Sequence, residues 1–357
     1  MTKLFCAWTR IHKTDEVKNN DLKFSLIIAI RNEGKNIKSL LESLYEQNYP
    51  KEQFEVIIID DHSQDESQKV IASFIEDKPL LQIKYYKLEE GKTGKKSALQ
   101  KAYSLAKNEI FVMTDGDIRV PKNWLKLIAE AFNKQEVKLV LGGVKIEGFN
   151  SFVSKFQGLE MLSLIASGAG AAELNQPIMS NGANMAFRKS ILESIELDKI
   201  KPEIASGDDV FLMLETKRIF GANSIRFVKD AEHFVTTKPV RSWKELINQR
   251  KRWVSKSGHY SDRFLLMSSW IVLLQNLGLL VLLISAFFIP VLLKTLALVW
   301  LVKSTFDFIF LRNICRFTSQ NYLLKYYPLM AIIYPFFISY TAIIGQFAHF
   351  SWKGRDY

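Results

Sequence analysis

The fold of this chain is decided by the stretch FSLIIAI at residues 24–30, a short apolar run rich in isoleucine. Residues 33–45 follow it with apolar side chains at the spacing of one helix face. The stretch FEVIII at residues 54–59 is a second run of the buried-strand type. Together they predict a strand, a helix and a second strand.

The same alternation continues beyond the second strand. Further strands are predicted at residues 82–86, 109–113 and 137–141, and further helices at residues 64–74, 95–106 and 124–132. Strands that alternate with helices indicate an α/β fold, with a mainly parallel sheet covered by helices on both faces. Binding sites in such sheets lie beyond the carboxyl ends of the strands, so we look for chemistry there.

The composition divides the chain into two unlike parts. Its 357 residues are 48% hydrophobic and 24% charged, with a formal net charge of +11, and the mean hydropathy is near zero. From Phe264 onward, however, only 9 of 94 residues are charged, and 7 of those 9 are basic. A charged domain joined to an apolar tail excludes both a disordered chain and an ordinary soluble single domain.

Two features of the sequence concern the cellular compartment. The two cysteines, Cys6 and Cys315, are far apart, which argues against a disulfide framework or a cysteine metal site. The apolar stretch at residues 4–8 is too short for a signal peptide. It could rest on a membrane surface or pack against the domain. We therefore expect the charged domain to stay in the cytosol.

The tail has the pattern of membrane-spanning helices. Residues 264–289 carry no charge, and residues 326–350 carry only His349 as an ionisable group; about 20 apolar residues cross a bilayer. Residues 291–310 are apolar but include charged residues, so they form a third span or a re-entrant or interfacial segment. Pro290 marks the turn before them. The basic connection before the last span predicts that this loop is cytoplasmic.

Two further segments allow more than one interpretation. Residues 241–263 are basic and precede the first span, as in an amphipathic helix at a lipid headgroup surface. Residues 151–172 have an apolar face that could line a membrane or acceptor, although core packing explains it as well. We divide the chain into an N-terminal segment, a catalytic domain, an interfacial segment and a tail of about three helices: residues 1–23, 24–240, 241–263 and 264–357.

Aspartates follow two of the predicted strands. Asp60 and Asp61 come after the strand at residues 54–59, and Asp115 and Asp117 come after the strand at residues 109–113. Aspartates also occur in turns and helix caps. Two carboxylates in one loop, however, provide the oxygen ligands that Mg²⁺ or Mn²⁺ needs to bridge a diphosphate.

Several other classes of protein are excluded by the motifs. The stretch GKTGKKS at residues 91–97 lacks the glycine spacing of a P-loop, although it could still approach a phosphate or cap a helix. No Gly-x-Gly-x-x-Gly follows the first strand, which argues against a dinucleotide-dependent oxidoreductase. The histidines lack metal-ligand spacing. We predict no nucleic-acid partner, because the positive charge fits a cytoplasmic membrane surface.

Seven segments in order carry a resemblance to a known family. They are AIRNE at 29–33, DDHSQD at 60–65, GKKSAL at 94–99, DGD at 115–117, NGANMAFR at 181–188, SGDD at 206–209 and QRKRW at 249–253. Over residues 24–260 the chain resembles the family 2 glycosyltransferases, which have a GT-A nucleotide-sugar domain and, in some members, membrane spans after it. Ala29 stands where many members have proline, and Asp208 replaces the usual glutamate before Asp209.

The resemblance implies a role for each matched residue. It implies a divalent cation, Mg²⁺ or Mn²⁺, bound by Asp115 and Asp117. Catalysis would depend on Asp209 as general base, on Asp117 and on Arg252. Donor binding would use Ala29, Arg31, Glu33, Asp60, Asp61, Lys95 and Asp115. Acceptor or product binding would use Asn181, Gly182, Asp208, Gln249 and Trp253.

From these observations we expect an inverting, metal-dependent hexosyltransferase in the membrane, with its catalytic domain in the cytosol, as at a bacterial inner membrane. It would move a sugar from a nucleotide donor, a UDP-sugar by expectation, to a lipid or glycan acceptor, with membrane lipids as further partners. A processive polysaccharide synthase is the alternative, since Gln-x-x-Arg-Trp also marks those enzymes. A membrane scaffold or transporter with a nucleotide-sensing domain is the non-enzymatic alternative.

Overall fold

The computed structural model describes residues 2–11, 21–195, 208–345, 351–352 and 355–356. The chain divides into two compact units. The first, called here the sheet unit, consists of Ala7–Lys145 and Gly168–Lys238. The second, called here the helical unit, consists of Met1–Cys6, Ile146–Ser167 and Pro239–Tyr357.

The sheet unit is built on a seven-stranded sheet with the strand order β3-β2-β1-β4-β7-β5-β8. All neighbouring strands are parallel except β7, which is antiparallel to both β4 and β5. The strands are β1 (Phe24–Ile30), β2 (Phe54–Asp60), β3 (Ile83–Lys87), β4 (Ile110–Asp115), β5 (Leu139–Leu141), β7 (Met185–Arg188) and β8 (Ile225–Phe227). Strands β6 (Val144–Ile146) and β9 (Val235–Thr237) form a separate two-stranded sheet.

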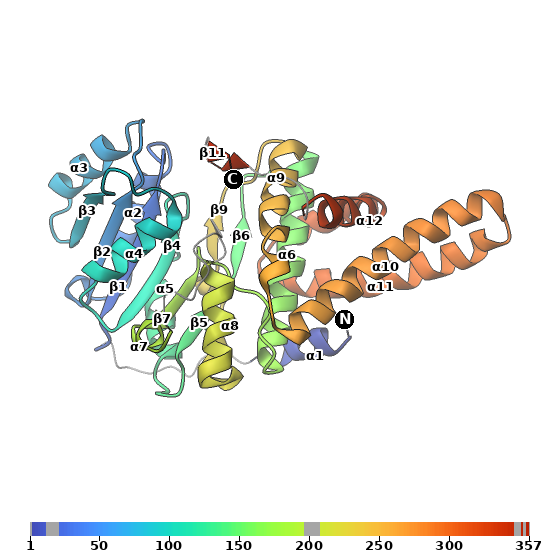
Figure 1. Ribbon diagram of the computed structural model, residues 1–357, viewed down its shortest axis with the longest axis horizontal. Coiled ribbons are helices and arrows are strands. Elements are labelled where there is room, and N and C mark those ends of the chain that lie inside the picture. Colours follow the sequence, from blue (N-terminus) through green and yellow to red (C-terminus); the bar gives the residue numbers. More distant parts are fainter. Residues whose placement is uncertain (1, 12–20, 196–207, 346–350, 353–354, 357) are drawn as a thin grey trace. The chain divides into compact units, whose positions relative to one another are not determined.

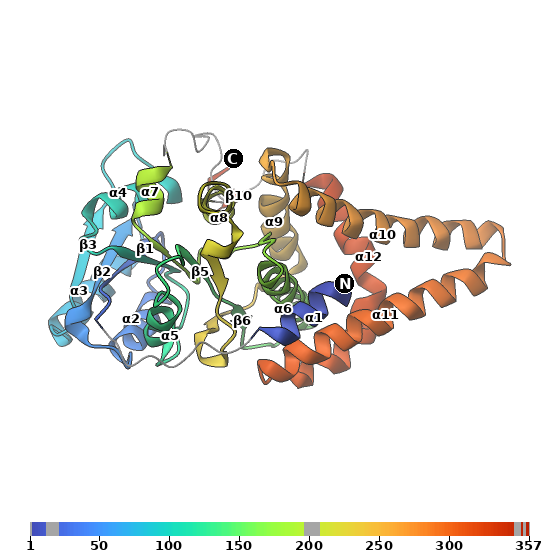
Figure 2. The same ribbon diagram turned by 90° about the horizontal axis from the view of Figure 1, so that it is seen from below.

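Helices cover both faces of this sheet, and Figure 2 shows α4, α7 and α8 on one side and α2, α3 and α5 on the other. Their bounds are α2 (Ile37–Tyr45), α3 (Ser67–Asp77), α4 (Lys95–Leu105), α5 (Trp124–Ala131), α7 (Ser190–Ser194) and α8 (Asp208–Phe220). Alternate residues of the central strands point to opposite faces. Ile27, Phe111 and Met113 therefore share one buried cluster with Leu99 of α4 and Met213 of α8. The predicted mainly parallel sheet with two helical layers is confirmed.

The N-terminus is packed. Helix α1 (Thr2–Arg10) places Trp8 in the sheet unit with no exposed surface. The Lys229 ammonium donates to the Trp8 carbonyl at 2.5 Å and lies 4.6 Å from the centre of the Trp8 ring. Phe227 meets the same ring edge to face. Of the two interpretations of residues 4–8, packing is the one that the structure supports at Trp8.

The helical unit consists of long helices (Figure 1). They are the first part of α6 (Phe152–Glu173), then α9 (Trp243–Val254), α10 (Arg263–Phe288), α11 (Leu292–Phe317), η6 (Asn321–Tyr326) and α12 (Tyr327–Ile344). Pro290 lies in the short turn between α10 and α11, as predicted. Within this unit, Phe156 of α6 packs against Trp243 of α9 and Phe337 of α12. The apolar face of α6 at Phe156 is thus core packing.

The tail forms helices at all three predicted positions, and two of them are long and apolar enough to cross a membrane. Among the described residues these are Arg263–Phe288 and Asn321–Ile344. Helix α11 differs from these two helices in that it contains several charged residues. Two of them, Lys303 and Asp307, form an ion pair at 2.6 Å. Residues 346–350, which belong to the last predicted span, lie outside the described residues.

Several boundaries differ from the sequence prediction. The helix predicted from residue 33 begins at Ile37, and the helix predicted from residue 64 begins at Ser67. In both cases the preceding residues form a connected pair of loops, described below. The four strands β6 to β9 were not predicted, because three- and four-residue strands carry too little periodicity to be recognised.

Candidate active site

Two loops at the carboxyl edge of the sheet are bound to each other. The Asn32 N–H donates to Ser63 Oγ at 2.9 Å, and the Gln64 N–H donates to Asn32 Oδ1 at 2.9 Å. The Gly34 N–H donates to Asp65 Oδ2 at 2.8 Å. These bonds hold residues 31–36 and 61–66 as turns, which is why α2 and α3 begin later than predicted. The two loops are therefore held in place relative to each other at this edge of the sheet.

Asp65 is one of the groups that fix these loops. Burial would raise the pKa of Asp65, but hydrogen bonds from Ser67 and from the Gly34 N–H lower this pKa below its ordinary value. Its carboxylate is thus held in the charged, accepting form at neutral pH.

Asp60 and Asp61 lie at the end of β2 and are both buried. Asp60 accepts from the Tyr85 hydroxyl at 2.6 Å and from the Ser63 N–H at 2.8 Å. Burial, and then the Asp60 carboxylate, raise the pKa of Tyr85, so this phenol stays a donor. Asp61 accepts from the Gly94 N–H at 3.1 Å, and its carbonyl accepts from Arg31 Nη1 at 2.7 Å.

The loop before α4 brings a lysine to the end of β4. Gly94 is the N-cap of α4 with φ +93, a conformation that favours glycine. The adjacent Lys95 ammonium binds Asp115 Oδ1 at 2.5 Å, and both side chains are partly exposed. The basic segment at 91–97 thus contains the N-cap of α4 and places the Lys95 ammonium at this edge of the sheet. Asp117, two residues beyond Asp115, is exposed.

Gly116 lies where no side chain fits. A Cβ there would lie 2.9 Å from Ile30 Cγ2 and 3.0 Å from Glu33 Cγ. Glu33 itself is buried, and its Oε2 accepts from Asn36 Nδ2 at 2.9 Å. The loop after β4 therefore packs directly onto Ile30 and the loop after β1, and a side chain at position 116 would require Ile30 or Glu33 to shift.

Asp209 reaches the same edge from α8. Its Oδ2 accepts from the Gly182 N–H at 2.9 Å and its Oδ1 accepts from the Val210 N–H at 2.9 Å. A Cβ on Gly182 would lie 3.6 Å from Asp209 Cβ and 3.8 Å from Met113 Cε. Because β7 is antiparallel, the segment before it begins at the carboxyl edge of β4, where Met113 pairs with Met185. Asn181 and Gly182 are held there with Asp209.

Asn184 is a residue that sequence reasoning did not assign. It is buried, and its Nδ2 donates to the carbonyls of Gly143 at 2.9 Å and His233 at 2.7 Å. Its Oδ1 accepts from Trp124 Nε1 at 2.9 Å. Its position in the segment NGANMAFR was the available signal. Asn184 holds the start of β7 in place.

The motif at residues 249–253 lies on α9, in the helical unit. Ser242 caps this helix by accepting from the Glu245 N–H. Gln249, Arg252 and Trp253 are each half-buried. Arg250, which was not assigned a role, is buried and forms a two-pronged ion pair with Glu160, with Nε–Oε1 at 2.9 Å and Nη2–Oε2 at 2.7 Å. Its guanidinium also lies 4.1 Å from the centre of the Trp253 ring.

Asp208 is the first residue of α8, and its side chain is outside the description. Ser206 and Gly207 of the segment SGDD lie outside the described residues. Ala29 is in β1, opposite Asp115 of β4, so its backbone lies at the same edge as the aspartates.

The atoms at this edge that could bind a metal ion are carboxylate oxygens, which are hard ligands. Among the described residues no cluster of three or more His, Cys, Asp or Glu side chains has the arrangement of a metal site. Asp115 and Asp117 offer two carboxylates in one loop, which is the chemistry that Mg²⁺ and Mn²⁺ favour, with the remaining positions left to a diphosphate and water. The pair therefore fits a cation that is shared with a substrate.

Comparison with known proteins finds a family that part of this chain resembles. Residues 25–195 match the family model described as "Glycosyl transferase family 2". This stretch is similar to family 2 glycosyltransferases. The match includes the strand-end aspartates and stops before Asp208 and the α9 motif.

Curated proteins similar to this chain are distant relatives. The poly(ribitol-phosphate) β-N-acetylglucosaminyltransferase TarS of Staphylococcus aureus is 25% identical over 218 residues, which are 61% of this chain and 36% of TarS. The probable glycosyltransferase YdaM of Bacillus subtilis is 24% identical over 251 residues, or 68% of this chain and 57% of YdaM. The β-monoglucosyldiacylglycerol synthase of Nostoc is 28% identical over 129 residues, or 36% and 27%. The matches thus cover less than two thirds of each of these relatives.

A solved structure has the same fold over almost the whole chain. It is the mannosyltransferase PcManGT from Pyrobaculum calidifontis, in complex with GDP-Man and Mn²⁺. The two superpose with a TM-score of 0.58 at 17% identity, covering 93% of this chain and 94% of the other. At this identity the likeness concerns the fold.

Proposed function

We propose that this protein is a family 2 glycosyltransferase of the inverting type, which transfers a sugar from a nucleoside diphosphate donor to a lipid or lipid-linked acceptor at a membrane. The observation that carries the proposal is the position of Asp209. Its carboxylate is held by the Gly182 and Val210 N–H groups beside Met113, at the edge of the sheet where β1, β2 and β4 end. A carboxylate fixed there is suited to remove a proton from an acceptor.

Asp209 is proposed as the general base. Each of its oxygens accepts one backbone hydrogen bond and keeps a lone pair for the acceptor hydroxyl. The hydroxyl proton passes to Asp209 while the hydroxyl oxygen bonds to the anomeric carbon and the bond from that carbon to the diphosphate oxygen breaks. Attack opposite to the leaving group inverts the anomeric centre, and one base suffices because the diphosphate needs no proton.

The donor site is proposed at the carboxyl edge of β1, β2 and β4. Asp60, Asp61 and Glu33 would contact the nucleoside, and Arg31 and Ala29 would shape its pocket. Lys95 would exchange its contact with Asp115 for a contact with the diphosphate. Acceptor or product contacts are proposed for Asn181, Gly182, Asp208, Gln249 and Trp253, and Arg252 would neutralise the leaving group.

A divalent cation is proposed on Asp115 and Asp117. Bound there with a diphosphate, it would offset the negative charge of the leaving group. The two carboxylates of one loop support this assignment, and the fold neighbour was solved with Mn²⁺. Removal of the cation with EDTA should abolish turnover, and Mg²⁺ or Mn²⁺ should restore it.

The membrane location rests on the helical unit. In helix α10 many large apolar side chains are exposed, among them Trp270, Leu274, Val281, Phe287 and Phe288. Exposed apolar surface on a helix of this length fits lipid. The name of the Nostoc relative, a β-monoglucosyldiacylglycerol synthase, supports a lipid acceptor. The catalytic domain would then lie on the cytosolic face.

The proposal is tested by release of nucleoside diphosphate from the purified full-length protein in nanodiscs. UDP-glucose, UDP-N-acetylglucosamine and GDP-mannose are offered as donors, each with dioleoylglycerol or with a bacterial membrane lipid extract as acceptor. Turnover with a UDP-sugar and one added sugar per lipid is the expected result. A ladder of products would instead indicate the processive synthase. Absence of release in every arm would favour the scaffold or transporter.

A further inference from the structure

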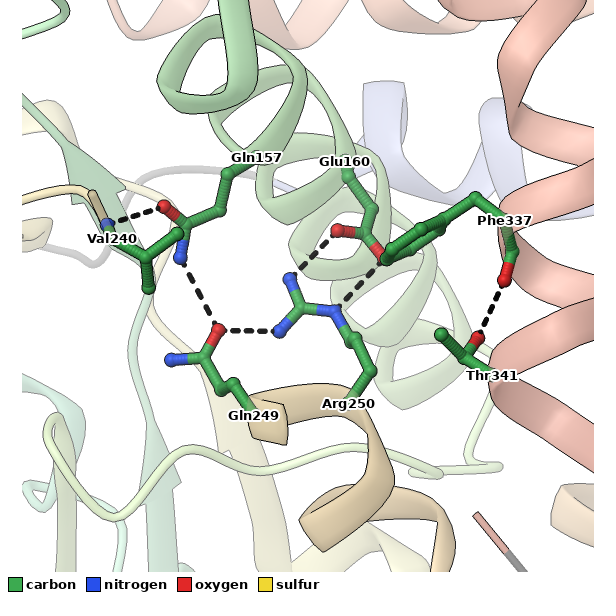
Figure 3. Close-up of polar contacts among 7 residues, drawn as sticks. All are labelled: Gln157, Glu160, Val240, Gln249, Arg250, Phe337 and Thr341. Atoms are coloured by element: carbon green, nitrogen blue, oxygen red, sulfur yellow. Dashed lines mark hydrogen bonds and ion pairs between the residues drawn. The ribbon is translucent and has the colours of Figure 1, made fainter. Parts of the chain in front are cut away.

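The helical unit contains a buried polar network, and Gln249 is the one member of it that has a role in the proposed reaction. It joins α6 to α9 through Gln157, Glu160, Gln249 and Arg250, together with the backbone of Val240 (Figure 3). Gln157, Glu160 and Arg250 are 2%, 2% and 4% exposed, whereas Gln249 is half-buried. The network therefore leads from fully buried side chains to the half-buried Gln249.

The hydrogen bonds fix the orientation of both amides, because each chain of bonds starts at a group that can only donate. The Val240 N–H donates to Gln157 at 3.0 Å, so the atom of Gln157 that faces it is the oxygen Oε1. The Nε2 of Gln157 then faces Gln249 at 3.2 Å and donates to its Oε1.

The second chain of bonds starts at Arg250. Its Nη1 donates to Gln249 Oε1 at 2.6 Å, and a guanidinium has no acceptor. Both lone pairs of the Gln249 oxygen are thus used inside the network. The amide nitrogen of Gln249 points away from Arg250 in Figure 3, and among the described residues no acceptor is assigned to it. Gln249 presents two N–H donors and no acceptor to a ligand.

Glu160 holds Arg250 in the position that makes this possible. The two-pronged contact uses Nε and Nη2 of the guanidinium and leaves Nη1 for Gln249. A planar fork of this kind has one orientation relative to its carboxylate, unlike a lysine ammonium. The same guanidinium covers one face of the Trp253 ring at 4.1 Å. Arg250 therefore fixes both Gln249 and Trp253 of the α9 motif.

We propose that Glu160 and Arg250, with Gln157, are positioning residues that make Gln249 a pure hydrogen-bond donor toward an oxygen atom of the sugar acceptor. This inference rests on the proposed function, because it names how one acceptor contact of that function is oriented. The ligand chemistry is a hydroxyl, ether or phosphate oxygen that can accept from an amide N–H.

The decisive variant is Gln249→Glu. A glutamate of the same shape keeps an oxygen for Arg250 and Gln157 but has no N–H to offer. If Gln249 serves only to satisfy Arg250, this variant behaves as the wild type. If its N–H groups contact the acceptor, the KM for the acceptor rises about tenfold, the loss expected for one hydrogen bond to a ligand. The KM for the donor and the melting temperature stay within error of the wild type.

The positioning role is tested by replacing the ion pair as a whole. In Glu160→Leu/Arg250→Met the pair becomes an apolar contact of similar volume, which proteins often tolerate. The Gln249 amide then loses its strongest orienting bond and populates both orientations, so the acceptor KM rises about two- to fivefold. Arg250→Lys is the second variant, since it keeps the charge beside Glu160 but has no fork to reach Gln249. The matched control is Lys303→Met/Asp307→Leu, which removes another ion pair of the same unit and leaves both KM values unchanged.

The assay is the nucleoside diphosphate release described above, with the donor and with dioleoylglycerol or lipid extract as probes. Wild-type turnover together with a raised acceptor KM in Gln249→Glu, in the pair replacement and in Arg250→Lys supports the proposal. An unchanged acceptor KM in Gln249→Glu, or in both a folded pair replacement and Arg250→Lys, overturns it while leaving the proposed function intact. Absence of turnover by the wild type in every arm overturns the proposed function and this inference with it.

Discussion

The strand-end aspartates and Asp209 of the sheet unit and the buried ion pair of the helical unit are held by different partners. In the sheet unit the carboxylates of Asp60, Asp61 and Asp209 accept from backbone N–H groups. In the helical unit the buried Arg250 is instead paired with the side chain of Glu160. A backbone donor survives when the side chain opposite it is replaced, whereas a charged side-chain partner is left behind unpaired. Single substitutions of these aspartates should therefore affect chemistry, and single substitutions in the ion pair should affect stability.

The largest expected effect is on the rate, at Asp209. Asp209→Asn keeps an oxygen for the Gly182 N–H but removes the base, so turnover falls by about 10²–10⁴ while the affinity for the nucleotide donor is retained. Nucleoside diphosphate release and calorimetric titration with the donor measure the two quantities. Glu215→Gln on the same helix, which affects only a surface pair with Arg218, should stay within about twofold. Full activity of Asp209→Asn would remove the base from the mechanism.

The second effect is on stability, at Arg250. Arg250→Met leaves the Glu160 carboxylate buried and unpaired, so the free energy of unfolding falls by about 3–5 kcal/mol. Replacing both residues, as in Glu160→Leu/Arg250→Met, should leave it near the wild-type value. Unfolding in micelles with a denaturing detergent measures both. Equal losses in the single and the double variant would contradict the difference drawn between the two units.

The third effect is a pH dependence of stability in the sheet unit. His233 is buried, and burial lowers its pKa from 6.5 to about 3, opposed by Asp230. Between pH 6.5 and about 3, His233 is therefore neutral in the folded protein and protonated in the unfolded chain. The unfolded state thus binds one more proton than the folded state in this range. Stability is fully present above pH 6.5 and is lost toward pH 3, by at most about 1.4 kcal/mol per pH unit.

Thermal unfolding between pH 4 and 8 checks this. His233→Leu removes the titrating group and should flatten the profile below pH 6.5 relative to the wild type. Parallel profiles of the two proteins would show that another group is responsible for the loss in acid.

The smallest effect concerns the packing of the loops that carry the aspartates. Gly116→Ala forces a Cβ against Ile30 and Glu33, at about 1–3 kcal/mol of stability and with weaker donor binding. Gly258→Ala is the control, because no described atom lies within 4 Å of the added Cβ. Denaturation and donor titration of both variants make the comparison. If Gly116→Ala behaves like Gly258→Ala, the loops are more adaptable than the hydrogen bonds between them indicate.

The local sequence was sufficient for the main strands and for the tail helices. The isoleucine-rich runs at 24–30 and 54–59 became β1 and β2, and the uncharged run from Phe264 became α10. Such segments are recognisable because burial on both faces, or in lipid, requires continuous apolar sequence. The starts of α2 and α3 were placed three or four residues early, since the hydrogen bonds that hold the loops before them come from the partner loop.

The candidate site was predictable in part. The pairs Asp60–Asp61 and Asp115–Asp117 could be placed at one edge, because parallel strands end together. Their roles as donor and cation ligands remain predictions. Asn184 and Glu160 were missed, because nothing in their local sequence distinguishes a buried residue that holds other elements by hydrogen bonds from an ordinary polar residue.

By itself, then, the sequence determined the strands β1 to β5, the long apolar helices, and which carboxylates follow the strands. Only the tertiary structure decided that β7 runs antiparallel between β4 and β5, which brings Gly182 and Asp209 to the carboxyl edge. Only the tertiary structure, too, decided that Arg250 is buried against Glu160. The physical reason is the same in both cases. The spacing of apolar residues along a segment shows which of its faces is buried. The partner of a polar group, by contrast, is provided by elements that are distant in sequence.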